Sequence, residues 1–247
     1  MKKIVFAVAA ALLVGISATA MAMDCVEITT AVDINSAYVW RGMTFNDGFV
    51  AQPSVNFSTC GFNLNVWGNV DIDDYDDSLD SGQMSETDFT LNYGFELGKV
   101  STTVGVIEYW YPDAGADEDT QEVYLSLGLP LGAGFTTTLD TYYDFDVMDE
   151  YYSKLGLSYG YDINDKTALT VGAAAGYAGE NYCADGEAGF FDYSLSLKLA
   201  YAVSDCLSLS AGITYVDAID DDKLVDADND GPLDVNTFGG VGMTYTF

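Results

Sequence analysis

Hydrophobic and polar residues alternate along almost the whole chain from Val26 onward, and this alternation restricts the fold more than any other feature. In the segment 86–97, for example, single polar residues separate the side chains of Phe89, Leu91 and Tyr93. A period of two residues is typical of a β-strand that has one apolar and one polar face. Helical periodicity is confined to the N-terminal segment, so the sequence predicts an all-β protein.

The alternation predicts twelve strands, an even number that is typical of bacterial outer-membrane barrels. Most of them reach the roughly 9–11 residues that a tilted strand needs to cross a bilayer. Short and long connections alternate, as in a barrel with short periplasmic turns and longer outer loops. The predicted fold is therefore a transmembrane antiparallel up-and-down β-barrel over residues 23–247. The expected strands are 26–42, 49–59, 61–72, 86–97, 100–110, 120–130, 134–145, 150–160, 166–178, 189–203, 206–217 and 234–247.

The N-terminal segment 1–22 has the pattern of a cleaved signal peptide. Lys2 and Lys3 precede an apolar segment at 4–16, and small residues lead up to Ala22. The apolar segment is shorter than the roughly 20 residues of a spanning helix, and we expect cleavage after Ala22. The sequence thus predicts an exported protein.

Charge and composition exclude several classes of function. The chain has 39 acidic and 8 basic residues, a net charge of −31 and no histidine. Nucleic acid is not an expected partner, because binding a phosphate backbone needs a basic surface. The lack of histidine excludes Ser-His-Asp and Cys-His nucleophiles, histidine-ligated zinc and a histidine base. Asp88 and Glu122 could in principle act as acid and base, but no spacing singles them out, so we expect no enzyme.

A soluble exported β-sandwich would also alternate, but two features favour a membrane barrel. The polar face consists of Asn, Thr, Ser, Gly and carboxylates with few Lys or Arg, unlike a solvated surface. Aromatic residues also gather near both ends of the predicted strands, as in the interfacial belts of membrane barrels. The expected belt residues are Trp40, Tyr109, Trp110, Tyr111, Tyr142, Tyr143, Tyr151, Tyr152, Phe190 and Phe191 at the loop end, and Tyr159, Tyr161, Tyr201, Tyr245 and Phe247 at the turn end.

The polar face is expected to line the lumen, where charged side chains set the sign of the ion that passes. Acidic residues outnumber basic ones there, so a channel should favour small polar or cationic solutes. Alternatively, the same residues pair into a network that closes the barrel. For Arg41, the single arginine, we expect a structural or constriction role, with ligand recognition as the alternative, and Asp33, Asp88 or Glu122 as its partner. The lumen and selectivity candidates are Arg41, Asp33, Asp88, Glu96, Glu122, Asp140, Lys154 and Lys198.

Two acidic loops, 71–80 and 220–234, are expected on the outer side. Within the second loop, aspartates at alternate positions precede a glycine, as in a calcium-binding loop, but Thr237 stands where a bidentate Glu is required. Both weak Ca²⁺ binding and a plain solvated loop fit this pattern, and divalent cations could also bridge these loops to outer-membrane lipid. No other cofactor is expected. The candidate metal ligands are Asp226, Asp228, Asp230 and Asp234.

Four cysteines are expected in an oxidising compartment, where disulfides persist. Their spacing does not match a metal site. Cys25 begins the first predicted strand and Cys60 ends the second, which makes Cys25–Cys60 the expected bridge, although free cysteines at turns fit the sequence equally well.

A series of motifs lies within about residues 35–125. The motifs are Ala37-Tyr38-Val39-Trp40-Arg41-Gly42-Met43-Thr44, Gln52-Pro53, Val66-Trp67-Gly68-Asn69-Val70-Asp71, Glu86-Thr87-Asp88, Tyr109-Trp110-Tyr111-Pro112 and Gln121-Glu122-Val123-Tyr124. Together they resemble the TorF-type porin family of Gram-negative exported proteins. This resemblance implies an outer-membrane barrel and a passive channel without a known substrate. The C-terminal Tyr245 and Phe247 are similar to the signal that the barrel-assembly machinery recognises.

Three interpretations follow from the sequence. The first is an outer-membrane channel that allows small polar or cationic solutes to diffuse passively. The second is a closed structural or adhesive barrel that displays acidic loops. The third is a soluble exported β-sandwich that binds a ligand.

Overall fold

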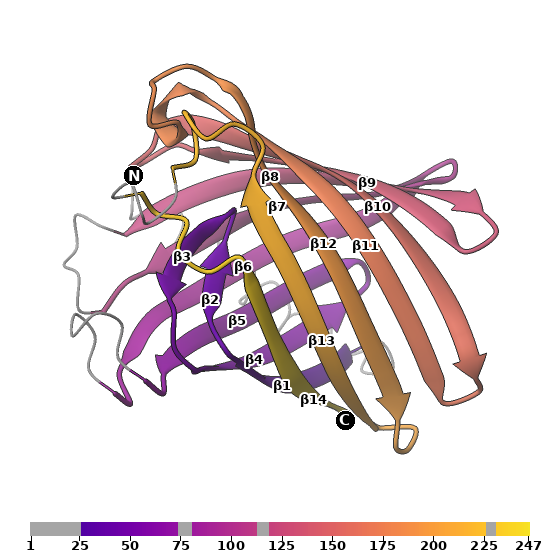
Figure 1. The fold of residues 1–247 in the computed structure, drawn as a ribbon. Coiled ribbons are helices and arrows are strands. Elements are labelled where there is room, and N and C mark those ends of the chain that lie inside the picture. The colour runs from indigo at the N-terminus through magenta and orange to yellow at the C-terminus, as the bar shows by residue number, and fades with distance from the viewer. Residues whose placement is uncertain (1–25, 74–80, 113–118, 226–230) are drawn as a thin grey trace, which may run out of the picture.

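The computed structural model describes residues 26–73, 81–112, 119–225 and 231–247 (Figure 1). Neighbouring strands pair antiparallel in sequence order, and β1 pairs with both β14 and β4, which closes the sheet into a barrel. The predicted fold class is confirmed. The barrel strands are β1 (Val26–Asn35), β4 (Val50–Thr59), β5 (Phe62–Asp71), β6 (Met84–Leu97), β7 (Val100–Trp110), β8 (Thr120–Gly132), β9 (Phe135–Asp144), β10 (Glu150–Asn164), β11 (Thr167–Ala178), β12 (Gly189–Ala202), β13 (Leu207–Ala218) and β14 (Thr237–Thr246).

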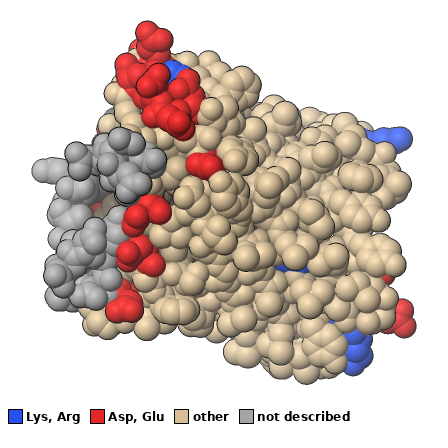
Figure 2. Space-filling view, in the orientation of Figure 1, with Lys and Arg blue, Asp and Glu red and all other residues tan. Residues whose placement is uncertain are grey.

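The outer surface of the wall is apolar, because alternate side chains of each strand point away from the lumen. On β12, for example, Leu195, Leu197 and Leu199 are exposed, whereas Asp192 on the opposite face is buried. Figure 2 shows this wall as a surface nearly free of charge, with acidic residues concentrated at the loop end. Among the described residues, no helix is long and apolar enough to cross a membrane.

Aromatic residues do lie near both ends of the strands, but at the loop end consecutive rings point to opposite sides of the wall. Phe190 is 59% exposed whereas Phe191 is fully buried, and Trp110 is exposed whereas Tyr109 is buried. The period of two residues that produces the outer belt therefore also supplies rings to the interior. The belt prediction is wrong for six residues, which lie inside: Trp40, Tyr109, Tyr111, Tyr142, Tyr152 and Phe191.

The first strand is shorter than predicted, and this difference shapes the lumen. Strand β1 ends at Asn35, and the remainder of the predicted strand 26–42 belongs to a separate hairpin of β2 (Tyr38–Trp40) and β3 (Met43–Asn46). Arg41 and Gly42 form its turn with φ values of 51° and 79°, as a two-residue hairpin turn requires. Because the residues before this turn continue the alternation, the sequence pattern did not separate the hairpin from β1.

Candidate functional site

The hairpin of β2 and β3 crosses the loop end of the lumen. It leaves the wall between β1 and β4, and β9 and β10 lie on the far side of the barrel from these two strands. The guanidinium of Arg41 reaches that far side, where its central carbon lies 4.7 Å from the ring centroids of both Tyr142 and Tyr152. The hairpin therefore bridges the whole lumen.

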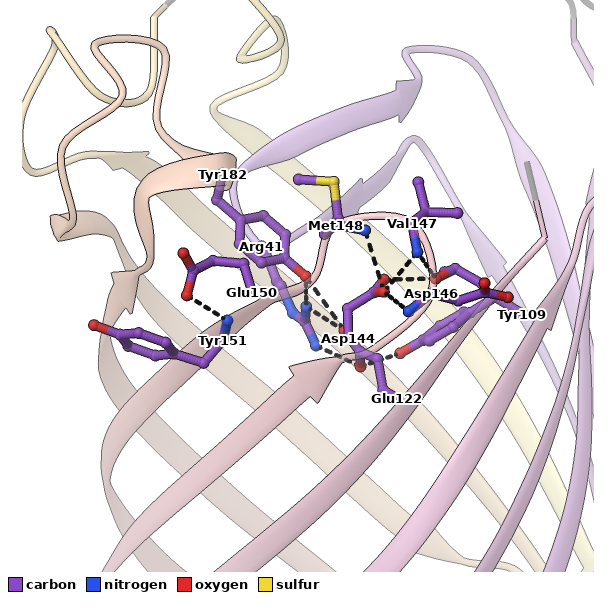
Figure 3. A network of polar contacts seen from close by, with 11 residues as sticks. Arg41, Tyr109, Glu122, Asp144, Asp146, Val147, Met148, Glu150, Tyr151 and Tyr182 are labelled. Atoms are coloured by element: carbon purple, nitrogen blue, oxygen red, sulfur yellow. Dashed lines mark hydrogen bonds and ion pairs between the residues drawn. The ribbon is translucent and has the colours of Figure 1, made fainter. Parts of the chain in front are cut away.

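The tip of the hairpin is held by a buried ion pair (Figure 3). Arg41 Nη1 and Nη2 donate to the two carboxylate oxygens of Glu122 at 2.7 and 2.8 Å, with side-chain exposures of 6% and 1%. The Tyr109 hydroxyl donates to Glu122 Oε2 at 2.8 Å, and the Tyr182 oxygen accepts from Arg41 Nη1 at 2.8 Å. Burying two charges is favourable only when both are paired and hydrogen-bonded, as they are here.

The arginine stays charged in this environment, although burial alone would lower its pKa. The hydrogen bond and the negative charge of Glu122 outweigh burial and raise the pKa of Arg41 above its usual range. Four aromatic rings surround the guanidinium, and the nearest is Trp40 of the same hairpin, 4.0 Å from ring centroid to guanidinium carbon. We call Glu122, Tyr109, Tyr142, Tyr152 and Tyr182 the wall pocket, since they stand on the wall and its loops rather than on the hairpin.

Apolar side chains from the outer loops fill the lumen beside the hairpin. Leu224 and Phe191 are fully buried, and Trp40 and Met43 pack against the same cluster. A Cβ at Gly42 would lie 2.5 Å from Leu224 Cδ2 and would need a strained φ of 79°, so a larger residue here would displace Leu224. The loop end is thus packed like a protein core. The buried members of the cluster are Tyr152, Ala178, Tyr182, Cys183, Phe191, Val216, Leu224 and Leu233.

The base of the hairpin is fixed by amide hydrogen bonds to the wall. Asn46 is fully buried, donates to Asp71 Oδ1 at 2.7 Å and accepts from the backbone N–H of Gly48 at 2.7 Å. Asn69 also donates to Asp71 Oδ1, at 2.9 Å, and accepts from Gln52 Nε2 at 3.1 Å. The chain of amides ties β3, β4 and β5 together where the hairpin leaves the wall.

A buried aspartate shapes the loop after β9, next to the wall pocket (Figure 3). Asp144 Oδ1 accepts from the backbone N–H groups of Asp146, Val147 and Met148 at 3.0 to 3.2 Å. The Met148 carbonyl then accepts from Asn181 Nδ2 at 2.6 Å. This bond links the loop after β9 to the loop that carries Tyr182 in the short 3-10 helix η2 (Glu180–Tyr182).

An ion pair joins the two long outer loops at the surface. Lys223 Nζ donates to Asp185 Oδ2 at 2.7 Å and to the Glu187 carbonyl at 2.8 Å. The hydrogen bond from Lys223 lowers the pKa of Asp185, and the same bond raises the pKa of Lys223. The pair holds the loop that contributes Leu224 against the loop that contributes Tyr182.

The turn-side half of the lumen differs, because its inward side chains remain accessible to solvent. Glu96 lies an even number of residues from Asp88 on β6, so both side chains point to the same, inner face. Lys198 and Asp192 are related in the same way on β12. Glu96 and Lys198 are nevertheless exposed to solvent. Asp140 on β9 is half-buried and accepts a hydrogen bond from Ser126. The structure therefore combines a packed loop end with a polar, water-accessible inner wall toward the turns.

The eight lumen candidates are divided between these two regions. The structure brings Arg41 and Glu122 into contact and places Asp88 near them on β6, where its Oδ1 is buried without a hydrogen-bond partner among the described residues. The other candidates lie on the accessible part of the wall: Asp33, Glu96, Asp140, Lys154 and Lys198.

Sequence reasoning missed the residues that complete the site from the loops. Tyr182 lies in the short helix η2 and Leu224 in a loop, and neither belongs to a periodic pattern, so no local signal marks them. Tyr152 was detectable, because an aromatic pair at the start of a strand must place one ring inside.

The remaining site predictions lie elsewhere. Cys25 and the loop residues Asp226, Asp228 and Asp230 fall outside the described residues, so neither the Cys25–Cys60 bridge nor the calcium loop is tested. Cys60 is exposed in the turn between β4 and β5, and no disulfide joins it to another cysteine of the described ranges. Asp234 is exposed, and its backbone N–H donates to Thr44 Oγ1 at 3.1 Å. Within the described ranges, no three acidic or cysteine side chains are placed to hold a metal ion.

The candidate assembly residues lie at the seam of the barrel. The backbone N–H of Phe247 donates to the Ile28 carbonyl of β1 at 3.0 Å. The rings of Tyr245 and Phe247 lie 4.9 Å apart, edge to face, and both are exposed on the outer surface. They therefore mark the line along which the last strand closes onto the first.

Solved structures with the same fold are outer-membrane porins and channels. The KdgM porin has a TM-score of 0.54 and 13% identity, covering 90% of this chain and 99% of that chain. The NanC porin has a TM-score of 0.54 and 10% identity, and the match covers 88% of this chain and 98% of the NanC chain. An outer membrane channel from Pseudomonas putida F1 has a TM-score of 0.54 and 14% identity, and the match covers 90% of this chain and 96% of the channel. At these identities the similarity concerns the fold alone.

A search of curated proteins finds no match to this chain. A family model does match it over residues 19–237, most of its length. That family is described as a bacterial protein of unknown function, and its name is Gcw_chp. The chain therefore belongs to the Gcw_chp family.

Proposed function

We propose that this protein is an outer-membrane channel that lets small polar or cationic solutes diffuse passively, and that the hairpin of β2 and β3 restricts its loop end. The observation that carries the proposal is the inner wall toward the turns. Inward side chains such as Glu96, Lys198 and Ser196 remain exposed to solvent although they face the interior of a closed barrel. A polar, solvent-accessible inner wall is what a water-filled channel requires.

The proposed preference for cations rests on the charges of the accessible inner wall. Arg41 and Glu122 neutralise each other in the packed region and therefore contribute little to selectivity. The accessible wall carries three carboxylates and two ammonium groups, and the outer loops add further carboxylates. The charged residues of the wall are Asp33, Glu96, Asp140, Lys154 and Lys198. Such a field raises the local concentration of cations and repels anions, and salt screens the effect.

The remaining parts of the proposal concern location and family. We propose that residues 1–22 are removed on export, that the barrel-assembly machinery inserts the chain, and that outer-membrane lipid surrounds the apolar wall. The motifs of residues 35–125 further suggest kinship with TorF-type porins. A solved complex of the KdgM porin contains disordered oligogalacturonate, and the net negative lumen here favours a solute of opposite or no charge.

A second function, a closed structural or adhesive barrel that displays acidic and weakly Ca²⁺-binding loops, is favoured by one observation. The hairpin and the outer loops pack into a continuous apolar cluster, with Leu224 and Phe191 fully buried, and a structure of this kind blocks passage while it persists. The two functions differ in whether the hairpin ever leaves the lumen.

Purified protein in a planar bilayer under a KCl gradient tests the proposed channel. We expect a small current, and the sign of its reversal potential should show that potassium passes more readily than chloride. Replacing Asp33, Glu96 and Asp140 by Asn, Gln and Asn should reduce that preference. The matched control replaces Asp220, Asp221 and Asp222 by Asn at the exposed loop and should change it less. An anion-selective current, or equal effects of the two triple variants, would contradict the proposal.

A further inference from the structure

We propose that the wall pocket is a binding site for a guanidinium or a similar organic cation, and that Arg41 occupies it as an internal ligand. This inference rests on the proposed function, because such a solute reaches the pocket through the lumen. In the closed barrel the guanidinium of the hairpin takes the place of the guanidinium of a solute.

The pocket is complete without the hairpin. Its carboxylate belongs to Glu122 of β8, and the Tyr109 hydroxyl of β7 donates to that carboxylate at 2.8 Å, which fixes its orientation. Both carboxylate oxygens bind the guanidinium in parallel, the geometry that distinguishes a planar guanidinium from an ammonium ion.

Aromatic rings form the sides of the pocket. Tyr142 and Tyr152 each present a ring with its centroid 4.7 Å from the guanidinium carbon, and Tyr182 adds a third at 5.7 Å. Rings arranged around a carboxylate select organic cations, because the attraction between a cation and an aromatic ring becomes stronger once the cation and the ring are removed from water. Hydrated inorganic cations gain less from such a pocket.

The backbone at Arg41 is that of an ordinary two-residue hairpin turn. Its φ of 51° lies in the left-handed region, which favours Gly, Asn or Asp, and Cys60 and Ala133 adopt the same conformation in other turns. Asn at this position would suit the turn better but would leave the pocket empty.

The inner wall next to the pocket carries a carboxylate and a pair of aromatic rings. Asp140 lies two residues before Tyr142 on β9, so both side chains face inward. The ring of Tyr124 on β8 stacks against Tyr142 with centroids 5.5 Å apart. An organic cation that enters from the turn side therefore meets a carboxylate and two rings before it reaches Glu122. By competing with Arg41, it would release the tip of the hairpin.

The test uses methylguanidinium and the folded full-length variant Arg41→Asn, which keeps the hairpin turn and removes the internal ligand. We expect saturable binding in detergent, measured by intrinsic fluorescence and by a rise in Tm. Binding to the wild type should be at least 10-fold weaker, because Arg41 competes. The double variant Arg41→Asn with Glu122→Gln should show no saturable binding, and methylammonium should bind Arg41→Asn less well than methylguanidinium.

Lys166→Ala, at the exposed turn between β10 and β11, is the control and should behave as the wild type. Heat-modifiable migration in gels verifies that each variant is folded. Arg41→Gly, which also suits the left-handed turn and empties the pocket, replaces Arg41→Asn if the latter does not fold. Equal binding by Arg41→Asn and the double variant, or none by Arg41→Asn or its substitute, would overturn the inference. Bilayer recordings separate the two proposals: current without binding contradicts only the pocket, and binding without current contradicts only the channel.

Discussion

Arg41 and Glu122 form a bidentate ion pair, with N–O distances of 2.7 and 2.8 Å, although the two residues approach each other from opposite sides of the barrel. The pair is almost fully buried, so each charge depends on the other for compensation. The position of the hairpin in the lumen therefore depends strongly on one contact between two side chains.

Breaking this pair should release the hairpin. Glu122→Gln leaves the buried guanidinium uncompensated, a change that costs about 3–5 kcal/mol in buried pairs. We expect a clearly larger single-channel conductance than that of the wild type and faster protease cleavage after Arg41. Glu27→Gln, at the exposed turn-side start of β1, is the matched control. Unchanged conductance and cleavage in Glu122→Gln would mean that packing alone holds the hairpin.

Gly42→Ala should loosen the tip by steric conflict. The added Cβ would lie 2.5 Å from Leu224 Cδ2 in a backbone conformation with a φ of 79°. We expect a conductance increase similar to that of Glu122→Gln, measured in planar bilayers. Gly82→Ala is the control, because Gly82 has a φ of 84° but open space around the new Cβ. Equal effects of both substitutions would show that backbone strain, and not the contact with Leu224, is responsible.

Asn46→Ala should weaken the base of the hairpin. It removes a buried donor to Asp71 Oδ1 and the acceptor of the Gly48 N–H, and unsatisfied buried groups cost about 1–3 kcal/mol each. Unfolding in urea, followed by gel migration, should begin at lower concentration than for the wild type. Asn164→Ala at an exposed turn serves as control. No difference between the two variants would contradict the assigned role of Asn46.

Acid should loosen the link between the outer loops. The pKa of Asp185 is lowered by Lys223, so the pair stabilises the folded loops above the ordinary pKa of an aspartate, about 4. This contribution is lost as the pH falls through the lowered folded value. Hydrogen exchange of 180–190, corrected for intrinsic rates, should be faster at pH 3 than at pH 7. In Asp185→Asn the exchange should already be fast at pH 7, and a slow rate there would contradict the role of the pair.

Phe247→Asp should impair assembly of the barrel. The backbone of Phe247 pairs with Ile28 of β1, and its ring stands on the outer surface beside Tyr245. A charge at this seam opposes insertion of the closing strand, and an open seam leaves backbone groups unpaired in lipid, at several kcal/mol each. The variant should accumulate in the periplasm, as fractionation would measure, whereas Phe95→Tyr should not. Normal amounts of Phe247→Asp in the outer membrane would contradict the assembly role.

The sequence predicted the wall well and the interior poorly, for a physical reason. Inside–outside alternation is a local property of each strand, so the segment at 100–110 was predicted with the bounds that the structure shows. The hairpin escaped detection because its two short strands keep the same alternation as β1. The pairing of Arg41 with Glu122 was among the partners considered, since a single arginine among carboxylates has few alternatives. Tyr182 and Leu224 depend on the paths of long loops, which no periodic pattern encodes.

The most direct test of the account is the conductance of a barrel without its hairpin. Because Asn35 pairs with Val50, residues 37–48 can be replaced by a short Gly-Ser linker without moving β1 or β4. Single-channel recordings in KCl should then show a stable conductance several times that of the wild type, with potassium preference. A folded, heat-modifiable variant that conducts no more than the wild type would contradict a channel restricted by this hairpin and would favour the closed structural barrel.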